Sequence, residues 1–176
     1  MIAAEALKYC SPEEFAAMEK DEHFTYELID GIVLMSPRPA VKHQKVSLNL
    51  ASALLHQLKG KNCDIVQEVD LVLEDNHFIP DIMITCGEKF EGQRHTNPPL
   101  IVIEIVSPSN ASHDYITKHH KYEQLGIQEY WIVSPEEACI WVISFEQQER
   151  VHYCNNQQAQ SIIMPELHVS LEDIFE

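Results

Sequence analysis

The chain has 176 residues, of which 45% are hydrophobic, and its formal net charge at pH 7 is −16. This length and apolar content are typical of one globular domain with a full core, spanning residues 1–176. A charge of −16 repels polyanions at long range, so the composition excludes a broad, non-specific nucleic-acid-binding surface. Any phosphate chemistry is therefore expected to be local and assisted by a bound cation.

Targeting signals and cysteines define the expected compartment. The first ten residues, MIAAEALKYC, lack the basic start and long apolar run of a secretory signal. No stretch approaches the roughly 18 apolar residues that a membrane-spanning helix needs, so we expect no membrane association. The five cysteines contain no C-x-x-C pair, which argues against a disulfide framework and against a thiolate zinc site. A reducing cytoplasm is the expected location.

The first third of the chain predicts a short helix, a hairpin and a long helix. Residues 11–14, SPEE, have the spacing of a capping box with proline at the first helical position. The dipeptide DG at 30–31 is a favoured hairpin turn between two apolar runs. Apolar residues recur at helical spacing over 41–58, and Gly60 follows as a stop signal.

The remainder is rich in predicted strands. CDIVQEVDLVLED (63–75) indicates one long or two short strands, FIPDIMIT (78–85) indicates the next, and 87–98 is a polar surface loop. LIVIEIV (100–106) is almost continuously apolar, which is typical of a strand buried on both faces. A helix over about 112–125 precedes the strands EYWIVSP and CIWVISF, a hairpin and a terminal turn or helix. This order predicts a mixed α/β fold, with a central β-sheet flanked by helices.

Two acids lie among β-branched residues, where a carboxylate is unfavourable. Asp81 follows Pro80 at the start of one apolar run, and Glu104 lies inside another. Ionised carboxylates there require a partner charge or a metal, so two of them on neighbouring strands predict a shared divalent cation. Oxygen ligands with open positions suit Mg²⁺. The alternative is that Asp81 caps a strand end and that Glu104 forms a buried ion pair.

The segments around these acids resemble a known family. They are YELIDGIVLMSP, HQKVSLNLASAL, PDIMI and IVIEIVSPSNASHDYITKHHKYEQLGIQEYWIVSP. They resemble the Uma family of putative restriction endonucleases, within the PD-(D/E)xK superfamily, over about residues 11–175. The resemblance implies a restriction-endonuclease-like core, and a DNA endonuclease that hydrolyses phosphodiester bonds with Mg²⁺ or Mn²⁺.

The lysine of the superfamily signature is displaced in this chain. At its usual position stands Val106. In the resembling family the lysine comes from the next helix, and the matching residue here is Lys118, four residues after Asp114 and four before Tyr122. The resemblance therefore implies Lys118 as the catalytic lysine. Lys121 is the lesser candidate for this role. The alternative is that Asp114 and Lys118 form an ordinary ion pair on the helix, without a catalytic role.

The resemblance implies one catalytic set for this chain. Asp81, Glu104 and the backbone carbonyl of Ile105 hold the metal. Lys118 lowers the pKa of the attacking water or orients it, and Glu27 completes the shell of the metal. A salt bridge within the hairpin is the alternative role of Glu27. DNA is the implied partner, through weak and local contacts.

Further residues are weaker candidates. Gln67 orients substrate or water, or it simply faces solvent. His43 begins the long predicted helix, where it contacts phosphate or is merely exposed. The other histidines lack an H-E-x-x-H or Cys/His pairing, so a solvated helix is expected rather than a zinc site.

Two expectations concern partners. An apolar sheet edge in the tail predicts a homodimer. The rival function is a non-catalytic protein-interaction module on a nuclease scaffold, which the charge of −16 and the valine at position 106 favour. In that case Asp81 and Glu104 are relics or salt-bridge partners.

Overall fold

The computed structural model describes residues 9–87, 89–107 and 112–176. The elements follow one another as α1 (Pro12–Ala17), β1 (Phe24–Ile29), β2 (Ile32–Pro37), α2 (Val41–Leu58), β3 (Cys63–Gln67), β4 (Asp70–Leu73), β5 (Asn76–Phe78), β6 (Ile82–Cys86), β7 (Arg94–His95), β8 (Ile101–Ile105), η1 (His113–Lys118), α3 (His119–Gln124), β9 (Glu129–Ser134), β10 (Cys139–Ser144), β11 (Glu149–Cys154), β12 (Gln158–Gln160), β13 (His168–Ser170) and α4 (Leu171–Phe175).

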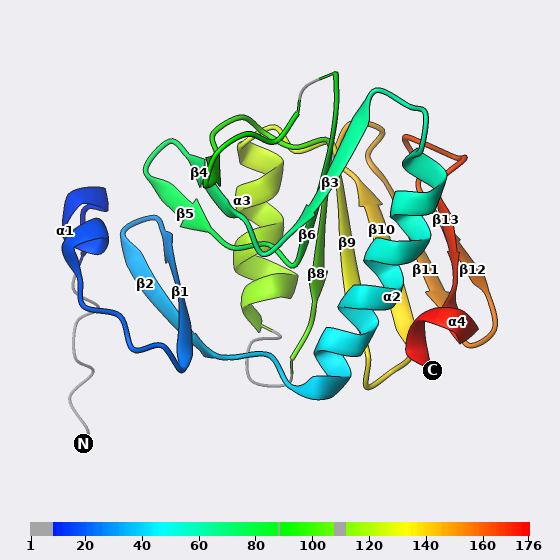
Figure 1. The fold of residues 1–176 in the computed structure, drawn as a ribbon, viewed down its shortest axis with the longest axis horizontal. Helices are drawn as coiled ribbons and strands as arrows, with labels where there is room; N and C mark the ends of the chain where they lie inside the picture. Colours follow the sequence, from blue (N-terminus) through cyan, green and yellow to red (C-terminus); the bar gives the residue numbers. More distant parts are fainter. Residues whose placement is uncertain (1–8, 88, 108–111) are drawn as a thin grey trace.

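The strands form two large sheets and one small one. The six-stranded sheet has the order β11-β10-β9-β8-β6-β3, the five-stranded sheet has the order β2-β1-β5-β4-β7, and β12 pairs with β13. Strands β8 and β9 are parallel, and the other neighbours within the six-stranded sheet are antiparallel. Figure 1 shows α2 in front of the six-stranded sheet, and the hairpin of β1 and β2 beside it. The predicted mixed α/β fold is confirmed.

Local signals explain the first three elements. The Ser11 hydroxyl accepts a hydrogen bond from the Glu14 N–H, and the Glu14 carboxylate accepts one from the Ser11 N–H, so the predicted capping box is present. Asp30 and Gly31 both have positive φ angles, 50° and 76°, as a two-residue type I′ hairpin turn requires. Helix α2 has the bounds that the apolar spacing predicted.

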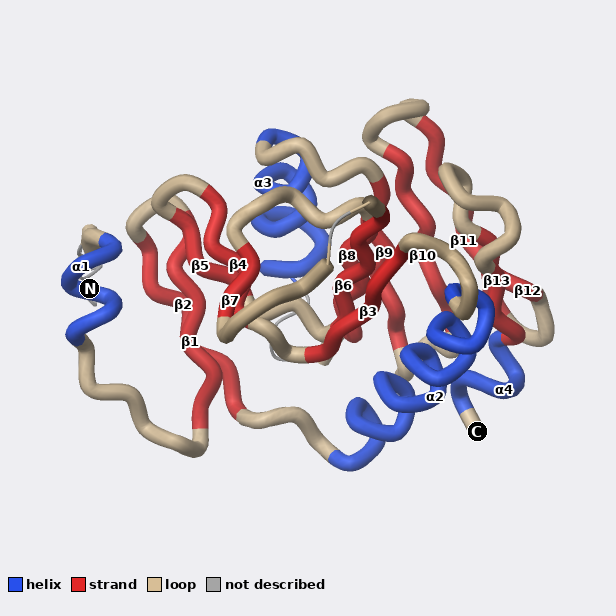
Figure 2. Tube along the Cα trace, turned by 45° about the horizontal axis from the view of Figure 1, so that its top comes forward, coloured by secondary structure: helices blue, strands red, loops and turns tan. Residues whose placement is uncertain are grey.

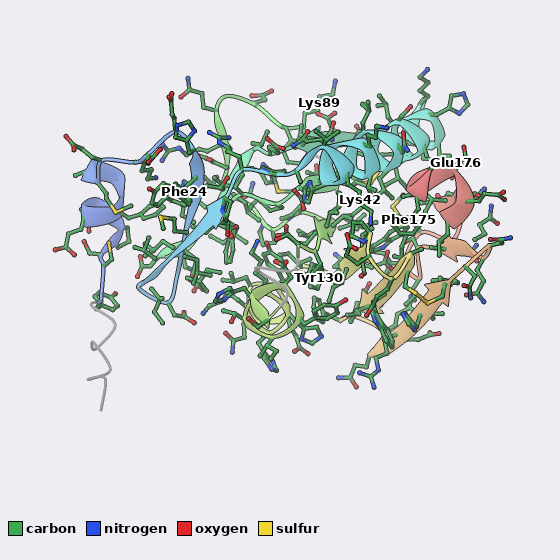
Figure 3. All side chains as sticks on the ribbon, turned by 90° about the horizontal axis from the view of Figure 1, so that it is seen from below. Phe24, Lys42, Lys89, Tyr130, Phe175 and Glu176 are labelled. Carbon is green, nitrogen blue, oxygen red and sulfur yellow. A yellow bond between two sulfur atoms is a disulfide. The ribbon has the colours of Figure 1, made fainter. Side chains whose placement is uncertain are left out.

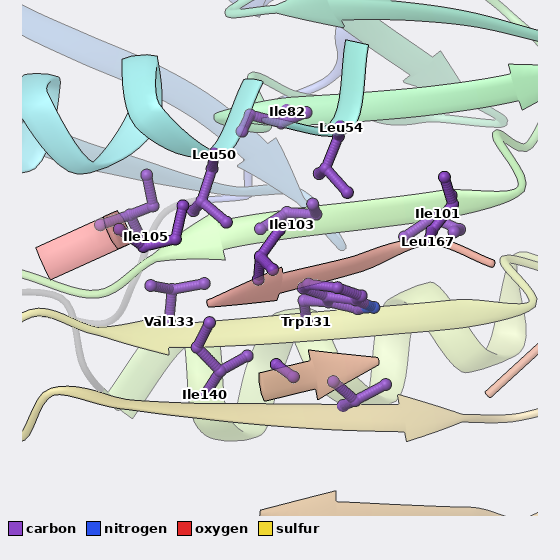
Figure 4. Packing of buried hydrophobic residues seen from close by; sticks show 14 of the residues in the cluster. Leu50, Leu54, Ile82, Ile101, Ile103, Ile105, Trp131, Val133, Ile140 and Leu167 are labelled. Atoms are coloured by element: carbon purple, nitrogen blue, oxygen red, sulfur yellow. The ribbon is translucent and has the colours of Figure 1, made fainter. Parts of the chain in front are cut away.

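Side chains alternate between the two faces of the six-stranded sheet, as in any β-strand. In β8, Ile103 and Ile105 pack with Leu50 of α2, whereas Val102 belongs to the apolar cluster on the α3 side. Figure 4 shows the first of these layers, and Figures 2 and 3 show α2 and α3 on opposite sides of the sheet. By the same alternation, Glu104 points to the α3 side.

Two predicted segments differ in detail. The loop over 87–98 contains β7, which pairs with β4 in parallel. The helix expected over 112–125 consists of the π-helical segment η1 followed by α3. The segment SPSNAS (107–112) supplies turn and capping residues for this helix in the sequence, but its residues 108–111 lie outside the described residues. Within the described part of the chain, no helix is long and apolar enough to span a bilayer.

Two disulfides join the two edge strands of the six-stranded sheet to their neighbours. Cys63 of β3 is bonded to Cys86 of β6, and Cys139 of β10 to Cys154 of β11. The expectation that the cysteines form no disulfide is therefore wrong. Each pair lies directly opposite in an antiparallel ladder, with Cα atoms 4.0 Å apart in the first pair and 4.3 Å apart in the second. Strand register, not spacing along the chain, decides this pairing, and the cysteines therefore give no support for a reducing compartment.

The outer edge at the tail is polar rather than apolar. Strand β11 is the edge strand, and Glu149 and Arg150 are exposed there. Among the described residues, the large hydrophobic side chains that are exposed lie elsewhere, three of them on α2: Val41, Leu48 and Leu55. The apolar tail edge that suggested a homodimer is therefore wrong, and the homodimer itself stays a prediction.

Replacing Cys63 and Cys86 together by serine releases β3 from β6. The disulfide joins residues 23 positions apart, and closing a loop of this length in the unfolded chain stabilises a protein by about 2–4 kcal/mol. We expect the free energy of unfolding, measured by urea denaturation of the oxidised protein, to fall by this amount. Equal urea midpoints for the parent and the variant would show that the bond does not stabilise this edge.

Candidate functional site

The ammonium group of Lys118 lies at the centre of a buried ion-pair cluster. Its Nζ is 2.9 Å from Glu27 Oε2, 3.0 Å from Glu104 Oε1 and 3.5 Å from Asp114 Oδ1. All four side chains are less than 10% exposed. The Tyr122 hydroxyl also donates a hydrogen bond to Glu104 Oε1, at 2.7 Å. The cluster therefore satisfies charges that would otherwise be strongly unfavourable in the core.

Three elements bring the four charged groups together. Glu27 comes from β1 and Glu104 from β8, whereas Asp114 and Lys118 come from η1. The second carboxylate oxygen of Glu27 accepts the Ile79 N–H at 2.9 Å, which fixes its direction. Residues four apart lie close together on one side of a helix, so Asp114 and Lys118 both face the strands. π-Helical segments are rare and frequently occur at functional sites.

Asp81 lies beside this cluster, directly before β6. Its Oδ2 accepts the Ile105 N–H at 2.6 Å and lies 3.3 Å from His43 Nε2. The bond to Ile105 holds Asp81 next to the end of β8, one residue beyond Glu104. The structure therefore brings together the predicted residues Glu27, Asp81, Glu104, Ile105 and Lys118.

These groups open into one cleft. Its volume is about 650 Å³, and it lies between the β1–β2 hairpin, the start of α2 and the end of β8. Acidic and basic side chains both line its walls away from the cluster. The residues of this kind are Lys20, Asp21, Glu22, Arg38, Lys42, His43, Glu68, Asp70, His77 and Glu136.

Burial and crowding shift the acids of the cluster toward their protonated forms. Burial raises the pKa of Glu104 well above its usual range, and the charges of Asp81, Asp114 and Glu27 add to this shift, although Lys118 opposes it. Burial also raises the pKa of Asp114 to about 6, against the opposing effect of Lys118. A carboxyl group with a raised pKa and a charged neighbour in a cleft is typical of functional sites.

Burial acts in the opposite direction on the two basic groups of the site, Lys118 and His43, but their pKa values are raised as well. Burial alone would lower the pKa of Lys118, but Glu104, Glu27 and Asp114 outweigh it and raise that pKa well above its usual value. Burial likewise opposes protonation of His43, yet its hydrogen bond to Asp81 raises its pKa. Lys118 is therefore a permanent cation at neutral pH.

The donor set fits a hard divalent cation. Asp81 and Glu104 offer carboxylate oxygens and Ile105 a backbone carbonyl, with Glu27 nearby, and Mg²⁺ prefers such oxygen ligands together with water. Three further observations agree: Asp81 lies beside three carboxylates that share one ammonium group, burial and the neighbouring like charges raise the pKa of Glu104, and the cleft has room for water and phosphate. The residues present therefore fit Mg²⁺ or Mn²⁺.

Two candidates from the sequence lie elsewhere. Lys121 pairs with Asp30 of the first hairpin, so Lys118 is the lysine that contacts the acids. Gln67 is exposed and donates a hydrogen bond to the Ser47 hydroxyl at 2.7 Å. It therefore supports α2 and does not point at Asp81.

Sequence reasoning missed two partners within the cluster. Asp114 and Tyr122 were recognised only as markers of a helical face, yet one pairs with Lys118 and the other donates to Glu104. Their spacing of four residues on each side of Lys118 was the signal available. This spacing predicted that the three side chains share one face of the helix. It did not predict that this face contacts Glu104 of β8.

Replacing Lys118 by methionine leaves three buried carboxylates without their cation. Breaking a buried ion pair costs about 3–5 kcal/mol, and we expect that loss of unfolding free energy at pH 8. The loss should be smaller at pH 5. The pKa of Asp114, already raised from 3.8 to about 6, rises further without the ammonium, and a raised carboxyl pKa favours the folded state at low pH and ceases to do so as pH rises. Urea denaturation at both pH values measures this.

The matched control is Lys121→Met. Lys121 lies three residues further along the same helical stretch, but its partner Asp30 is 64% exposed. Such pairs contribute roughly 0–1 kcal/mol, so this variant should stay close to the parent at both pH values. Equal losses for the two variants, or a larger loss for Lys118→Met at pH 5 than at pH 8, would contradict the role of the cluster.

Comparisons with known proteins agree with this geometry. The family model Uma2, described as a putative restriction endonuclease, matches residues 12–173, whereas no curated protein matches the chain. The crystal structure of a putative nuclease belonging to DUF820 from Anabaena variabilis ATCC 29413 has 22% sequence identity and a TM-score of 0.78, and the match covers 94% of this chain and 97% of that chain. At this identity the likeness supports the fold alone. Because the family model spans nearly all of the sequence, the chain belongs to the Uma2 family of putative restriction endonucleases.

Proposed function

We propose that this chain is a divalent-metal-dependent endonuclease that hydrolyses phosphodiester bonds in DNA. The observation that carries the proposal is the convergence of Glu27, Asp81, Glu104 and Lys118 in one cleft. The family description as a putative restriction endonuclease supports it. So does the fold shared with the DUF820 protein, which is described as a putative nuclease.

In this proposal Asp81, Glu104 and the Ile105 carbonyl hold Mg²⁺ or Mn²⁺. The cation would stabilise charge on the scissile phosphate and lower the pKa of an attacking water. Asp81 is oriented for this role because its Oδ2 accepts the Ile105 N–H. Glu27 is held by the Ile79 N–H and completes the acidic wall of the site.

Lys118 acts as a cation and hydrogen-bond donor rather than as a base. Its pKa is raised well above the usual value, because three carboxylates surround it, so it does not release its proton near neutral pH. Its ammonium group can donate to an attacking water and stabilise negative charge that develops on the phosphate. Tyr122 and Asp114 position it, since both contact the same group of charges.

DNA contacts in this proposal are few and local. Lys20, Arg38 and Lys42 line the cleft, but Lys42 pairs with Glu136, and further acids share the walls. Phosphate contacts by so few cations give weak binding with a shallow dependence on salt. This arrangement is compatible with a net charge of −16.

A non-catalytic interaction module on the same scaffold is the second candidate. One observation favours it: Lys118 pairs with Glu27, Glu104 and Asp114, so the protein itself supplies a counter-charge for these acids. A purely structural cluster of this kind needs no divalent cation. The two experiments below give opposite results for the two candidates.

Mg²⁺ or Mn²⁺ should raise the thermal midpoint of unfolding. A ligand at 100 times its Kd stabilises the folded state by about 2.7 kcal/mol, which corresponds to roughly 5–10 °C for a chain of this size. Asp81→Asn should remove the shift, because it deletes one charged ligand. Glu136→Gln, an exposed acid that also lines the cleft, should keep it. Equal midpoints with metal and with chelator would exclude a metal site of this strength.

Metal-dependent nicking of supercoiled plasmid DNA tests catalysis itself. We expect the parent protein to convert supercoiled into open-circular DNA with Mn²⁺ or Mg²⁺ but not with chelator. Asp81→Asn and Glu104→Gln should each lower the rate by about 10²-fold or more, as for the loss of a group that stabilises the transition state. Glu136→Gln is again the control and should nick at the parental rate.

The decisive outcome is the rate of Asp81→Asn relative to the parent. If both proteins nick at the same rate, the activity comes from a contaminant or from another site. If neither nicks any of a panel of supercoiled, linear and single-stranded DNA, the interaction module becomes the better assignment.

A further inference from the structure

Outside the cleft, one end of the β10–β11 ladder gathers three soft metal-binding side chains. Cys139 and Cys154 lie directly opposite each other, and His152 lies opposite Trp141 in the same ladder. His152 precedes Cys154 by two residues, so both side chains lie on the same face of β11. One ligand atom from each of Cys139, His152 and Cys154 lies within 4.8 Å of the other two.

The imidazole of His152 is held in place. Its ring stacks on Trp141 with centroids 3.9 Å apart and an interplanar angle of 9°. In this orientation Nε2 is 3.4 Å from Cys154 Sγ. A ligand ring that is oriented by a neighbouring group before the metal arrives binds more tightly than a free one.

We propose that reduction of the Cys139–Cys154 disulfide converts this cluster into a site for Zn²⁺ or a similar thiophilic divalent cation. Two thiolates and the neutral imidazole of His152 supply three ligands, and solvent takes the fourth position of a tetrahedral site. Thiolate and imidazole ligands select zinc over the magnesium that carboxylates prefer.

The conversion needs a dithiol reductant. Its two thiols give two electrons and two protons to the sulfur atoms of Cys139 and Cys154, and the reductant becomes a disulfide. Binding of Zn²⁺ then releases the two thiol protons to solvent. The metal reconnects β10 to the edge strand β11, so this edge stays cross-linked in both redox states.

The other disulfide provides a comparison within the same sheet. Cys63 and Cys86 also join an edge strand to its neighbour. Among the described residues, two groups of three histidine, cysteine or carboxylate side chains lie close enough together to hold a metal ion. One is Cys139, His152 and Cys154. The other is His119, His120 and Glu123, which contains no thiol. The Cys63–Cys86 pair belongs to neither cluster and so lacks the third ligand.

Cobalt(II) is the probe for this site, because a thiolate ligand gives Co²⁺ a charge-transfer absorption that carboxylates do not. A full-length variant with serine at Cys10, Cys63 and Cys86 retains only the proposed pair. After reduction with dithiothreitol and anaerobic desalting, we expect one equivalent of Co²⁺ to produce the thiolate band and Zn²⁺ to abolish it. The oxidised variant should give no band. Co²⁺ bound to the carboxylate oxygens of the cleft gives no thiolate charge-transfer band, so the measurement is independent of the proposed nuclease function.

Two controls make the result specific. Adding His152→Ala should weaken Co²⁺ binding by at least about tenfold. The converse variant, with serine at Cys10, Cys139 and Cys154, keeps only Cys63 and Cys86 and should bind at least tenfold more weakly than the first variant. Circular dichroism verifies folding, and if the triple variants do not fold, the reduced parent and its His152→Ala variant give the same comparison.

The absence of a thiolate band in the reduced, folded protein would overturn the proposal. Equal affinity of the two cysteine pairs would also overturn it, because the third ligand would then contribute nothing. An unchanged Co²⁺ affinity in the His152→Ala variant would likewise overturn the proposal.

Discussion

The ion-pair cluster around Lys118 is the interaction on which the rest of the structure depends. Glu27 belongs to the five-stranded sheet, Glu104 to the six-stranded sheet, and Asp114 and Lys118 to the helix beside them. One ammonium group therefore joins three separate layers. Burial of the ammonium group is tolerable because three carboxylates surround it, and loss of Lys118 would leave those acids in the core without a counter-charge.

The same cluster reconciles an acidic protein with phosphate chemistry. Glu27, Asp81, Glu104 and Asp114 outnumber the basic groups Lys118 and His43 at the cleft. In the proposed function, this excess of acidic groups attracts a divalent cation while it repels phosphate. A bound cation reverses that local sign. The proposed nuclease would therefore need no basic surface at its reacting centre, and its overall charge would bear on how DNA arrives rather than on the chemistry.

Sequence patterns predicted the elements that local interactions decide. The capping box at Ser11, the turn at Asp30-Gly31 and the bounds of α2 depend on neighbouring residues, and all three are present. The site residues Glu27 and Lys118 came from the family resemblance. The disulfides, strand β7 and the π-helical segment were missed because strand register and tertiary packing decide them. The cysteines show this most directly, since Cys63 and Cys86 are 23 residues apart yet face each other across one ladder.

Anomalous diffraction from crystals soaked in Mn²⁺ tests the central claim most directly. The account predicts one strong peak in the cleft, within bonding distance of carboxylate oxygens of Asp81 and Glu104 and of the Ile105 carbonyl, with the Lys118 ammonium still beside Glu27. A cleft without an anomalous peak at saturating Mn²⁺, or a peak whose ligands include neither Asp81 nor Glu104, would contradict it.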